Sequence, residues 1–512
     1  MNSRPEIIDN SALMPKKRTN LLLPAAGIWG AVVVIILAFL IVSDFQKPGR
    51  NDYFLLPWSI GAGVLLLLPA AYLFYRGNRD IFHPLIFALW SYIFPAFVIG
   101  GIILAFGWTR AYFLVFVNNP QIDYPLSLAY VVLGYYGLVI GFFIPIGKGI
   151  AKGIDRWGPH WNWSAEDLWI PGVVFLSMGV GLNILGFLQG IFGFQRVDEI
   201  GALDSVLVFL AISFTVGYVL LWLAFFLTKQ KTPLHWGIFT VMILMIPFRM
   251  ALQGGRSGLL LILLPIALAF WYSDHKITWK HITAVGVMGF VAVMIGVIYG
   301  TTFRNIKGSE ARVSAGDYVG QIGETIDYLS RKDTLVILGD GMQSLAERVD
   351  NLSSLAVVVS NYEALEPYEE SYGLKDNIIN DLLTAFVPRF AWPDKPTTSD
   401  PRAYSDLYFN YGENSFAITP FGDLLRNFGV IGILIGMIIV GVYLRAIYSY
   451  LIETENPQPW KTASYFPLLT VVSYEGFYAV IFPSMIRVLL VIVVCMIIGS
   501  LLIRDSSRMR SF

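Results

Sequence analysis

The sequence predicts an all-α membrane protein that crosses the bilayer about twelve times. Of its 512 residues, 56% are hydrophobic and 14% are charged, and the mean hydropathy is +0.62. Apolar runs of about 20 residues, the length of helix that crosses a ~30 Å hydrocarbon core, recur along the chain. One long polar stretch, residues 304–427, interrupts them. These observations are typical of a multi-span helical protein with one large water-facing segment.

The predicted spans divide the chain into successive parts. A tail at residues 1–20 precedes nine spans within 21–303, the polar segment occupies 304–427, three spans lie within 428–503, and a tail covers 504–512. The first span is too long for the apolar core of a typical signal peptide, so we interpret it as a retained anchor. Spans seven and eight are short, and a hairpin that does not cross fully is their alternative. The twelve spans are expected near residues 21–43, 54–75, 84–106, 126–146, 168–192, 202–227, 236–252, 258–273, 282–303, 428–448, 464–483 and 486–503.

The charged residues predict which side of the membrane each loop faces. The 36 basic and 36 acidic residues cancel, so net charge gives no reason to expect nucleic-acid binding. Lysine and arginine are concentrated in both tails and in one set of short loops, which is the pattern of cytoplasmic segments. We therefore expect both termini in the cytoplasm and residues 304–427 outside it. The single cysteine, Cys495, lies in the last apolar run, which excludes a disulfide framework and a cysteine-based metal cluster.

The external segment is expected to contain two amphipathic surface helices. Apolar residues recur at mainly helical spacing over residues 341–361 and again over 375–386, where the pattern stops before Pro388. Such helices lie along a membrane surface or cap a helical bundle. We therefore expect Arg389 and Lys395, which follow the second helix, near the lipid headgroups.

Arginine is the side chain best suited to phosphate, because its planar fork donates to two phosphate oxygens and stays charged. For any single arginine on the external face, pairing with the carboxylates of the same segment is the ordinary interpretation. For Arg389 we favour a binding role, because the prolines of its Pro-Arg-x-x-Trp-Pro-x-Lys-Pro frame restrict the backbone. The external arginines are Arg304, Arg312, Arg348, Arg389, Arg402 and Arg426.

The remaining candidates concern proton transfer. All five histidines map to the cytoplasmic half, so an external general base must be a carboxylate: Asp406, Glu413 or Asp423. Helix capping or salt bridging is the alternative for each. No Gly-rich phosphate loop, Asp-x-Asp pair on the external face or His-x-x-x-His spacing is present, so we expect no metal. Within the spans, Glu475 and Arg249 could form a structural ion pair, a proton-coupling site or part of a substrate groove, with the structural pair as the default.

Several motifs of this chain resemble those of the Wzy-type oligosaccharide repeat-unit polymerases, the O-antigen polymerase family. The most specific is the proline-framed sequence around Arg389. The similarity covers mostly residues 254–432, and the N-terminal spans agree only in kind. Some relatives carry paired Arg-x10-Gly motifs, whereas this chain has one, from Arg312 to Gly323. The matching stretches are Gly254-Gly255-Arg256-Ser257-Gly258, Arg348-Val349-Asp350-Asn351, Tyr372-Gly373, Val387-Pro388-Arg389-Phe390-Ala391-Trp392-Pro393-Asp394-Lys395-Pro396 and Phe421 to Gly432.

The resemblance implies a GT-C-like glycosyltransferase of the bacterial cytoplasmic (inner) membrane that needs no metal or other cofactor. Such an enzyme transfers a growing glycan from one polyprenyl pyrophosphate to the non-reducing end of another carrier-linked repeat unit, building O-antigen, capsule or exopolysaccharide. Its partners are this lipid-linked oligosaccharide, membrane lipid, a chain-length regulator and a flippase, with no nucleic acid.

We expect three groups of site residues on this basis. The pyrophosphate ligands are Arg389 and Arg348, helped by Arg256, Arg304, Lys395 and Arg426. The residue that polarises the acceptor hydroxyl is Glu413 or Asp423. The faces for sugar rings are Trp392, Tyr404, Tyr408 and Tyr411.

Two other functions stay open. A transporter or flippase of a lipid-linked glycan also fits twelve spans and a carboxylate at Glu475, and would place its site on broken helices near the membrane midplane. A glycan ligase would pass the polymer to a different acceptor. The long external segment favours the polymerase, and the missing external histidine counts modestly against the ligase.

Overall fold

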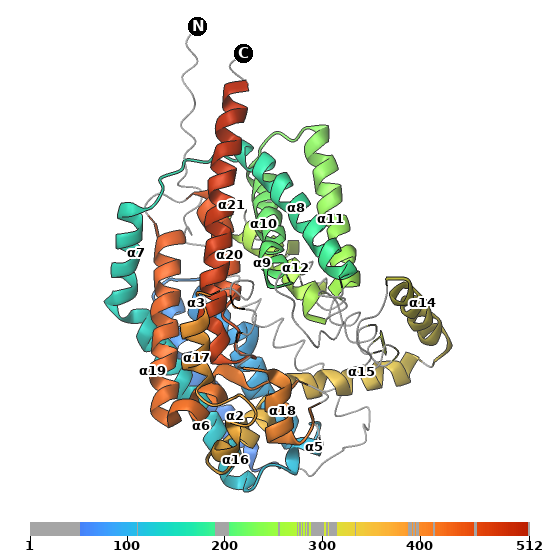
Figure 1. Ribbon diagram of the computed structural model, residues 1–512, viewed down its shortest axis with the longest axis vertical. Helices are drawn as coiled ribbons and strands as arrows, with labels where there is room; N and C mark the ends of the chain where they lie inside the picture. The colour runs from blue at the N-terminus through green and yellow to red at the C-terminus, as the bar shows by residue number, and fades with distance from the viewer. Residues whose placement is uncertain are drawn as a thin grey trace.

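The computed structural model describes residues 52–109, 111–189, 204–253, 256–273, isolated positions between 275 and 306, residues 315–332, 334–387, 392, 395, 399–412, 415–454 and 458–509. Within these residues every regular element is a helix and none is a strand. The prediction of an all-α fold is confirmed. Figure 1 shows the helices as a bundle with α14 and α15 extending to one side.

Seven helices of the described residues are long and apolar enough to cross a membrane. They cover Leu55–Tyr75, Pro84–Ala105, Pro120–Phe143, Glu166–Leu188, Val206–Leu227, Thr419–Leu451 and Tyr478–Arg504. Two shorter apolar stretches, Pro233–Ile246 and Ile262–Tyr272, lie in the helices predicted as spans seven and eight. The predicted span at 21–43 lies outside the described residues, as does most of 282–303. A membrane-spanning helical protein is therefore supported, while the count of twelve and the orientation of the termini stay predictions.

The helical elements follow one another in two series. The first contains α2 (Leu55–Tyr75), α3 (Pro84–Ala88), the π-helix η2 (Leu89–Ile99), α4 (Gly100–Ala105), α5 (Ala111–Leu114), α6 (Pro120–Phe143), α7 (Pro145–Trp157), η3 (Glu166–Leu168), α8 (Trp169–Leu188), α9 (Asp204–Leu210), α10 (Ser213–Leu227), α11 (Pro233–Gln253) and α12 (Arg256–Tyr272). The second contains α14 (Ala315–Arg331), α15 (Thr334–Val349), α16 (Leu352–Glu369), α17 (Asn377–Thr384), α18 (Pro401–Phe409), α19 (Thr419–Leu451), α20 (Pro459–Thr470), η4 (Tyr478–Val480) and α21 (Ile481–Met509).

Glycines allow α6 and α19 to pack closely along much of their length (Figure 1). A Cβ added at Gly137 would lie 2.8 Å from the Leu434 carbonyl oxygen, and one at Gly441 would lie 2.8 Å from the Phe142 nitrogen. Small residues permit such backbone contact between membrane helices, where packing and not the hydrophobic effect holds helices together. This pair forms the scaffold beneath the polar segment.

The expected amphipathic helix over residues 341–361 is two helices instead. The side chain of Asp350 accepts from the Ser353 backbone N–H at 3.0 Å, as a capping residue does, so α15 ends at Val349 and α16 begins at Leu352. The first half of α16 is buried, so it is not a surface helix. The second expected helix is confirmed as α17, which ends before Pro388.

The helix α19 is broken at Gly429, whose φ of 66° and ψ of −163° are not helical. A Cβ added at Gly436 would lie 2.7 Å from Leu424 Cδ1. In an unbroken helix, residues twelve apart would be separated by about 18 Å. The part from Thr419 to Phe428 is therefore a short helix folded back on the longer part. The longer part begins after Gly429, close to residue 428, where the sequence predicts the start of span ten.

The predicted span at 464–483 is wrong as a continuous helix. α20 ends at Thr470, and residues 471–477 are not helical. The Ser473 hydroxyl accepts from the backbone N–H groups of Glu475 and Gly476, at 3.3 Å each, which stabilises a turn in place of a helix. Irregular backbone at membrane depth is tolerated where it is buried in protein or lines a cavity. Glu475 thus lies on a break, and its carbonyl oxygen accepts from the Thr419 N–H at 3.2 Å.

Candidate functional site

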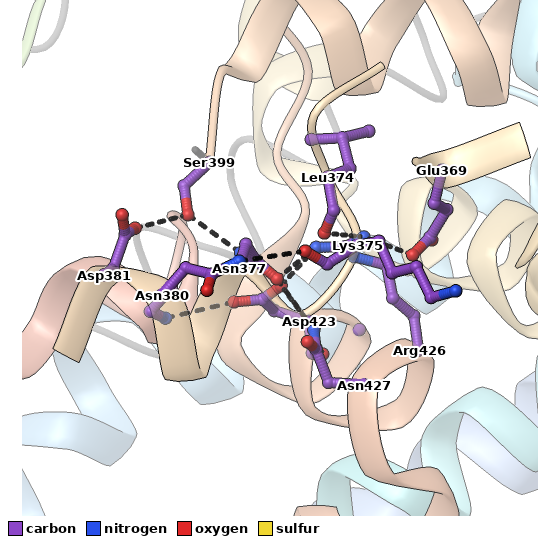
Figure 2. A network of polar contacts seen from close by, with 12 residues as sticks. Glu369, Leu374, Lys375, Asn377, Asn380, Asp381, Ser399, Asp423, Arg426 and Asn427 are labelled. Carbon is purple, nitrogen blue, oxygen red and sulfur yellow. Dashed lines mark hydrogen bonds and ion pairs between the residues drawn. The ribbon is translucent and has the colours of Figure 1, made fainter. Parts of the chain in front are cut away.

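A buried polar network is centred on Arg426, in the folded-back part of α19 (Figure 2). Its guanidinium lies 2.8 Å from Glu369 Oε2 and 2.9 Å from Asp423 Oδ1, and its side chain has no solvent exposure. It also donates to the Leu374 carbonyl oxygen at 3.1 Å. Two carboxylates therefore share one cation away from water.

Asn377, the first residue of α17, extends this network. Its Oδ1 accepts from Arg426 Nη2 at 2.6 Å, and its Nδ2 donates to Ser399 Oγ at 2.8 Å and to Asp423 Oδ1 at 3.2 Å. Ser399 in turn donates to Asp381 Oδ2 at 2.6 Å. Figure 2 shows these side chains as one chain of contacts between α17 and α19.

Two further contacts fix the carboxylates. The second oxygen of Asp423 accepts from the Ala479 backbone N–H at 3.0 Å, and Glu369 Oε1 accepts from the Tyr408 hydroxyl at 2.9 Å. Burial raises the pKa of the Glu369 carboxyl, and the facing Arg426 guanidinium opposes that shift. The network therefore ties α16, α17, α18, α19 and η4 together.

Four of the expected site residues lie in or beside this buried network. Arg426 was expected to bind pyrophosphate, Asp423 to act as a base, and Tyr404 and Tyr408 to stack on sugars. All four are buried, and Arg426, Asp423 and Tyr408 bond to protein groups. In this arrangement they cannot contact a substrate unless the network opens, so their positions suit a structural role.

A second polar site contains an ion pair between Arg348, in the last turn of α15, and Glu475, on the broken segment. The two side chains are 52% and 38% exposed, so they are accessible in a way that Arg426 is not. The Tyr92 hydroxyl is buried, has no hydrogen-bond partner among the described residues, and interacts electrostatically with both. Arg348 was expected to bind pyrophosphate. Glu475 pairs with Arg348 here, and its expected pairing with Arg249 stays a prediction because the Arg249 side chain lies outside the described residues.

A small polar cavity of about 20 Å³ lies beside Arg348. Its lining includes Asn351, Ser354 and Ser415, and the Ser354 hydroxyl donates to the Ala417 carbonyl oxygen at 2.5 Å. This volume fits roughly one water molecule. The cavity connects the α15–α16 junction with the residues that lead into α19.

An apolar groove of about 500 Å³ runs along α19 below α17. Ile431, Ile435 and Ile439 line it at a spacing of four residues and are exposed, so the groove faces the lipid side of the bundle. One end of the groove adjoins the polar network. Its lining residue Leu424 follows Asp423 directly in the chain, and the backbone N–H of the lining residue Ala479 donates to the Asp423 carboxylate. The lining residues are Ile378, Leu382, Leu424, Phe428, Ile431, Gly432, Ile435, Gly436, Ile439, Tyr478, Ala479 and Phe482.

The other expected site residues fall into two groups. Trp392 and Tyr411 are exposed and could receive a sugar ring, whereas Lys395 donates to the Thr384 carbonyl oxygen at 2.6 Å and caps the end of α17. Arg389, Arg304 and Glu413 lie outside the described residues. Arg256 begins α12, but its side chain is not described. In the part of the chain that is described, no group of three or more His, Cys, Asp or Glu side chains could hold a metal ion.

The sequence predicted Glu475 in mid-helix and so did not indicate that it lies beside Arg348 of the polar segment. Pro467, Ser473 and Gly476 were the available signal, because three helix-disfavouring residues fall in ten positions of the predicted span. Comparison with known proteins adds no identification. No protein-family model, no curated protein and no solved structure matches the chain significantly.

Proposed function

We propose that the protein is a membrane glycosyltransferase that polymerises oligosaccharide repeat units carried on polyprenyl pyrophosphate. The observation that carries the proposal is the apolar groove along α19, which opens to lipid and ends at the Asp423 network. Ala479, which lines the groove, lies four positions after Glu475, which belongs to the accessible ion pair. The groove would therefore bind the lipid chain, and the neighbouring Arg348–Glu475 pair would contact the charged headgroup.

The groove suits an isoprenoid chain because its lining is almost entirely aliphatic and aromatic. Its volume of about 500 Å³ holds part of a long polyprenyl chain, and the remainder would stay among the bilayer lipids. The lateral opening lets a lipid-linked substrate enter without leaving the membrane.

Among the arginines that the structure describes, Arg348 is the one that we propose binds the pyrophosphate. Its guanidinium is half exposed, and its only ionic partner in the described part of the chain is Glu475. A planar fork of donors stabilises the negative charge that develops on the departing diphosphate. The sequence-based assignment of Arg389, Arg304 and Arg256 to the same group stays part of the proposal.

Among the carboxylates that the structure describes, Glu475 is the one that we propose accepts a proton from the acceptor sugar. In the reaction, the acceptor hydroxyl oxygen forms a bond to the anomeric carbon of the growing glycan as the bond from that carbon to the diphosphate oxygen breaks. The hydroxyl proton passes to the carboxylate, and polyprenyl diphosphate leaves with the bonding electrons. Glu413 is the alternative base that the sequence predicts.

The test is the surface glycan of the native host carrying Arg348→Ala or Glu475→Gln. We expect each variant to lose the long-chain ladder on a gel while single repeat units remain attached to the cell surface. Arg331→Ala is the matched control, because Arg331 forms an exposed ion pair with Asp327 on α14. A full ladder from Arg348→Ala at normal protein levels would refute the assignment.

A transporter or flippase of the lipid-linked glycan is the second candidate. Glu475 lies on a broken membrane segment, and α19 is broken at Gly429, as is typical of transporter sites. The same experiment separates the two. Loss of transport in Glu475→Gln would remove single repeat units from the surface together with the ladder, whereas loss of polymerisation leaves them. A ligase defect would instead leave polymer on its lipid carrier.

A further inference from the structure

The helix α7 follows the membrane-spanning α6 after a single residue, Ile144, and carries two exposed faces of opposite character. Ile146, Ile150 and Ile154 recur every four residues and are 58%, 46% and 43% exposed. Trp157 lies on the same face and is 88% exposed. Side chains four apart share one side of a helix, so these residues form a continuous apolar stripe that nothing in the described structure covers.

The other face of α7 is basic. Lys148, Lys152 and Arg156 also recur every four residues, and all three are exposed. At about 100° per residue, the centre of this stripe lies roughly opposite the centre of the isoleucine stripe. The acidic residue of this helix, Asp155, forms an ion pair with Lys461, with 3.2 Å between Oδ1 and Nζ. Within the described residues none of the three cations forms an ion pair, so their positive charge is available to a partner.

A third, narrow face attaches α7 to the bundle. Gly147 and Ala151 are its only buried residues. A Cβ added at Gly147 would lie 2.6 Å from Arg445 Cβ and 2.7 Å from the Val442 carbonyl oxygen, so the helix contacts α19 closely here (Figure 1). The apolar and basic stripes remain outside this contact.

The position of α7 along the chain shows what surrounds these stripes. α6 has 24 residues, and a helix of that length reaches about 36 Å, enough to cross a ~30 Å hydrocarbon core. α7 therefore begins where the membrane ends. Charged and aromatic groups of the kind found at membrane interfaces accompany it, namely the Arg445–Glu453 pair and Tyr450.

We propose that α7 is an interfacial helix that binds anionic phospholipid. Ile146, Ile150, Ile154 and Trp157 contact the acyl chains, and Lys148, Lys152 and Arg156 contact the phosphate groups of the same leaflet. The partner is a lipid surface, because both stripes lie at the membrane boundary and their apolar and cationic characters match the two layers of an anionic leaflet. The proposal does not depend on the glycosyltransferase assignment.

The first test measures which lipids the full-length protein retains. The chain is extracted from nanodiscs that contain equal amounts of phosphatidylglycerol and phosphatidylcholine, and bound lipids are counted by native mass spectrometry. We expect the native protein to retain more phosphatidylglycerol than phosphatidylcholine. In the variant K148Q/K152Q/R156Q the ratio of the two bound lipids should fall at least about tenfold, since each basic residue near an anionic surface raises the affinity about fivefold. The control R331Q/K332Q/K375Q removes the same charge from the outer segment and should retain the native ratio. Equal preference in both triple variants would overturn the proposal.

The second test needs no change to the basic stripe. An environment-sensitive fluorophore is attached to a single cysteine at Ile150→Cys, with Cys495→Ala as background and Glu366→Cys on α16 as a solvent-exposed reference. We expect the label at position 150 to emit at shorter wavelength and to be quenched by brominated acyl chains. Emission matching that of the label at position 366, without quenching, would show that the isoleucine stripe faces water and would contradict the proposal.

Discussion

The Nη1 atom of Arg426 lies 2.8 Å from the carboxylate of Glu369, and both side chains are buried. Glu369 ends α16, whereas Arg426 belongs to the folded-back start of α19, so the contact joins parts of the chain that are 57 residues apart. Asp423 faces the same guanidinium at 2.9 Å. The pair therefore holds the end of α16 against the folded-back start of α19, whose Leu424 lines the apolar groove.

Replacing Arg426 by Ala should destabilise the protein strongly. Removing one partner of a buried ion pair leaves an uncompensated charge, which typically costs about 3–5 kcal/mol, and here two carboxylates lose their cation. Unfolding of the purified protein in detergent, followed by tryptophan fluorescence, measures the change. The control is Arg331→Ala, whose exposed pair with Asp327 should contribute less than about 1 kcal/mol. Similar unfolding of both variants would contradict a structural role for Arg426.

Replacing Gly429 by Ala should also destabilise the fold. The φ of 66° and ψ of −163° at this position lie in a region that is essentially restricted to glycine, and a side chain there costs about 1–3 kcal/mol. The same unfolding measurement applies. The matched control is Gly181→Ala within α8, where an added Cβ meets no atom within 4 Å and should be tolerated or slightly stabilising. If Gly429→Ala unfolded with the same free energy as the native protein, the bend would not require glycine at this position.

Filling the apolar groove should weaken use of a lipid-linked substrate. Ile435 lines the groove and is exposed, so Ile435→Trp adds bulk there without displacing buried residues. We expect KM for the lipid-linked repeat unit to rise several-fold with a smaller change in kcat, because the substitution removes binding surface and not a reacting group. Ile497→Trp on α21 is the control, since Ile497 is exposed but does not line the groove. Equal KM values in the two variants would argue against the groove as the lipid site.

Arg348→Lys should separate charge from geometry in the accessible ion pair. Lysine keeps the positive charge facing Glu475 but lacks the planar fork that meets two diphosphate oxygens. We expect stability to change by less than about 1 kcal/mol, because both side chains are more than one third exposed. The proposed polymerising activity should nevertheless fall by about tenfold or more, since one lost transition-state hydrogen bond of about 1.4 kcal/mol changes a rate tenfold. A lysine variant as active as the native protein would show that the fork is not used.

Among the described residues, the prediction of helices was correct where the hydrophobic runs were long and uninterrupted. The runs at 54–75 and 84–106 correspond closely to Leu55–Tyr75 and Pro84–Ala105, and the run at 486–503 lies within the longer helix Tyr478–Arg504. It was wrong where a few local residues override hydrophobicity. Asp350 divides one expected helix by capping the next, and Ser473 with Gly476 ends the span that would have placed Glu475 in mid-membrane.

The candidate site was predictable in its residue types but not in its partners. Arg348 was identified from the sequence, yet nothing in its neighbours indicates that Glu475, 127 positions later, faces it. Arg426, Asp423, Tyr404 and Tyr408 also carry the side chains that a substrate site needs. Their burial follows from the packing of α16 on α19 and of α18 on α16, which no local pattern records.

The helical type of this protein, and the apolar character that lets it cross a membrane, can be predicted from the amino-acid order alone, because the energy of placing a side chain in hydrocarbon depends on that side chain and its near neighbours. Which charged groups are buried in pairs and which remain accessible is known only from the folded chain. That distinction depends on contacts between distant segments, since a guanidinium is stabilised or left open by whichever carboxylate the fold brings to it.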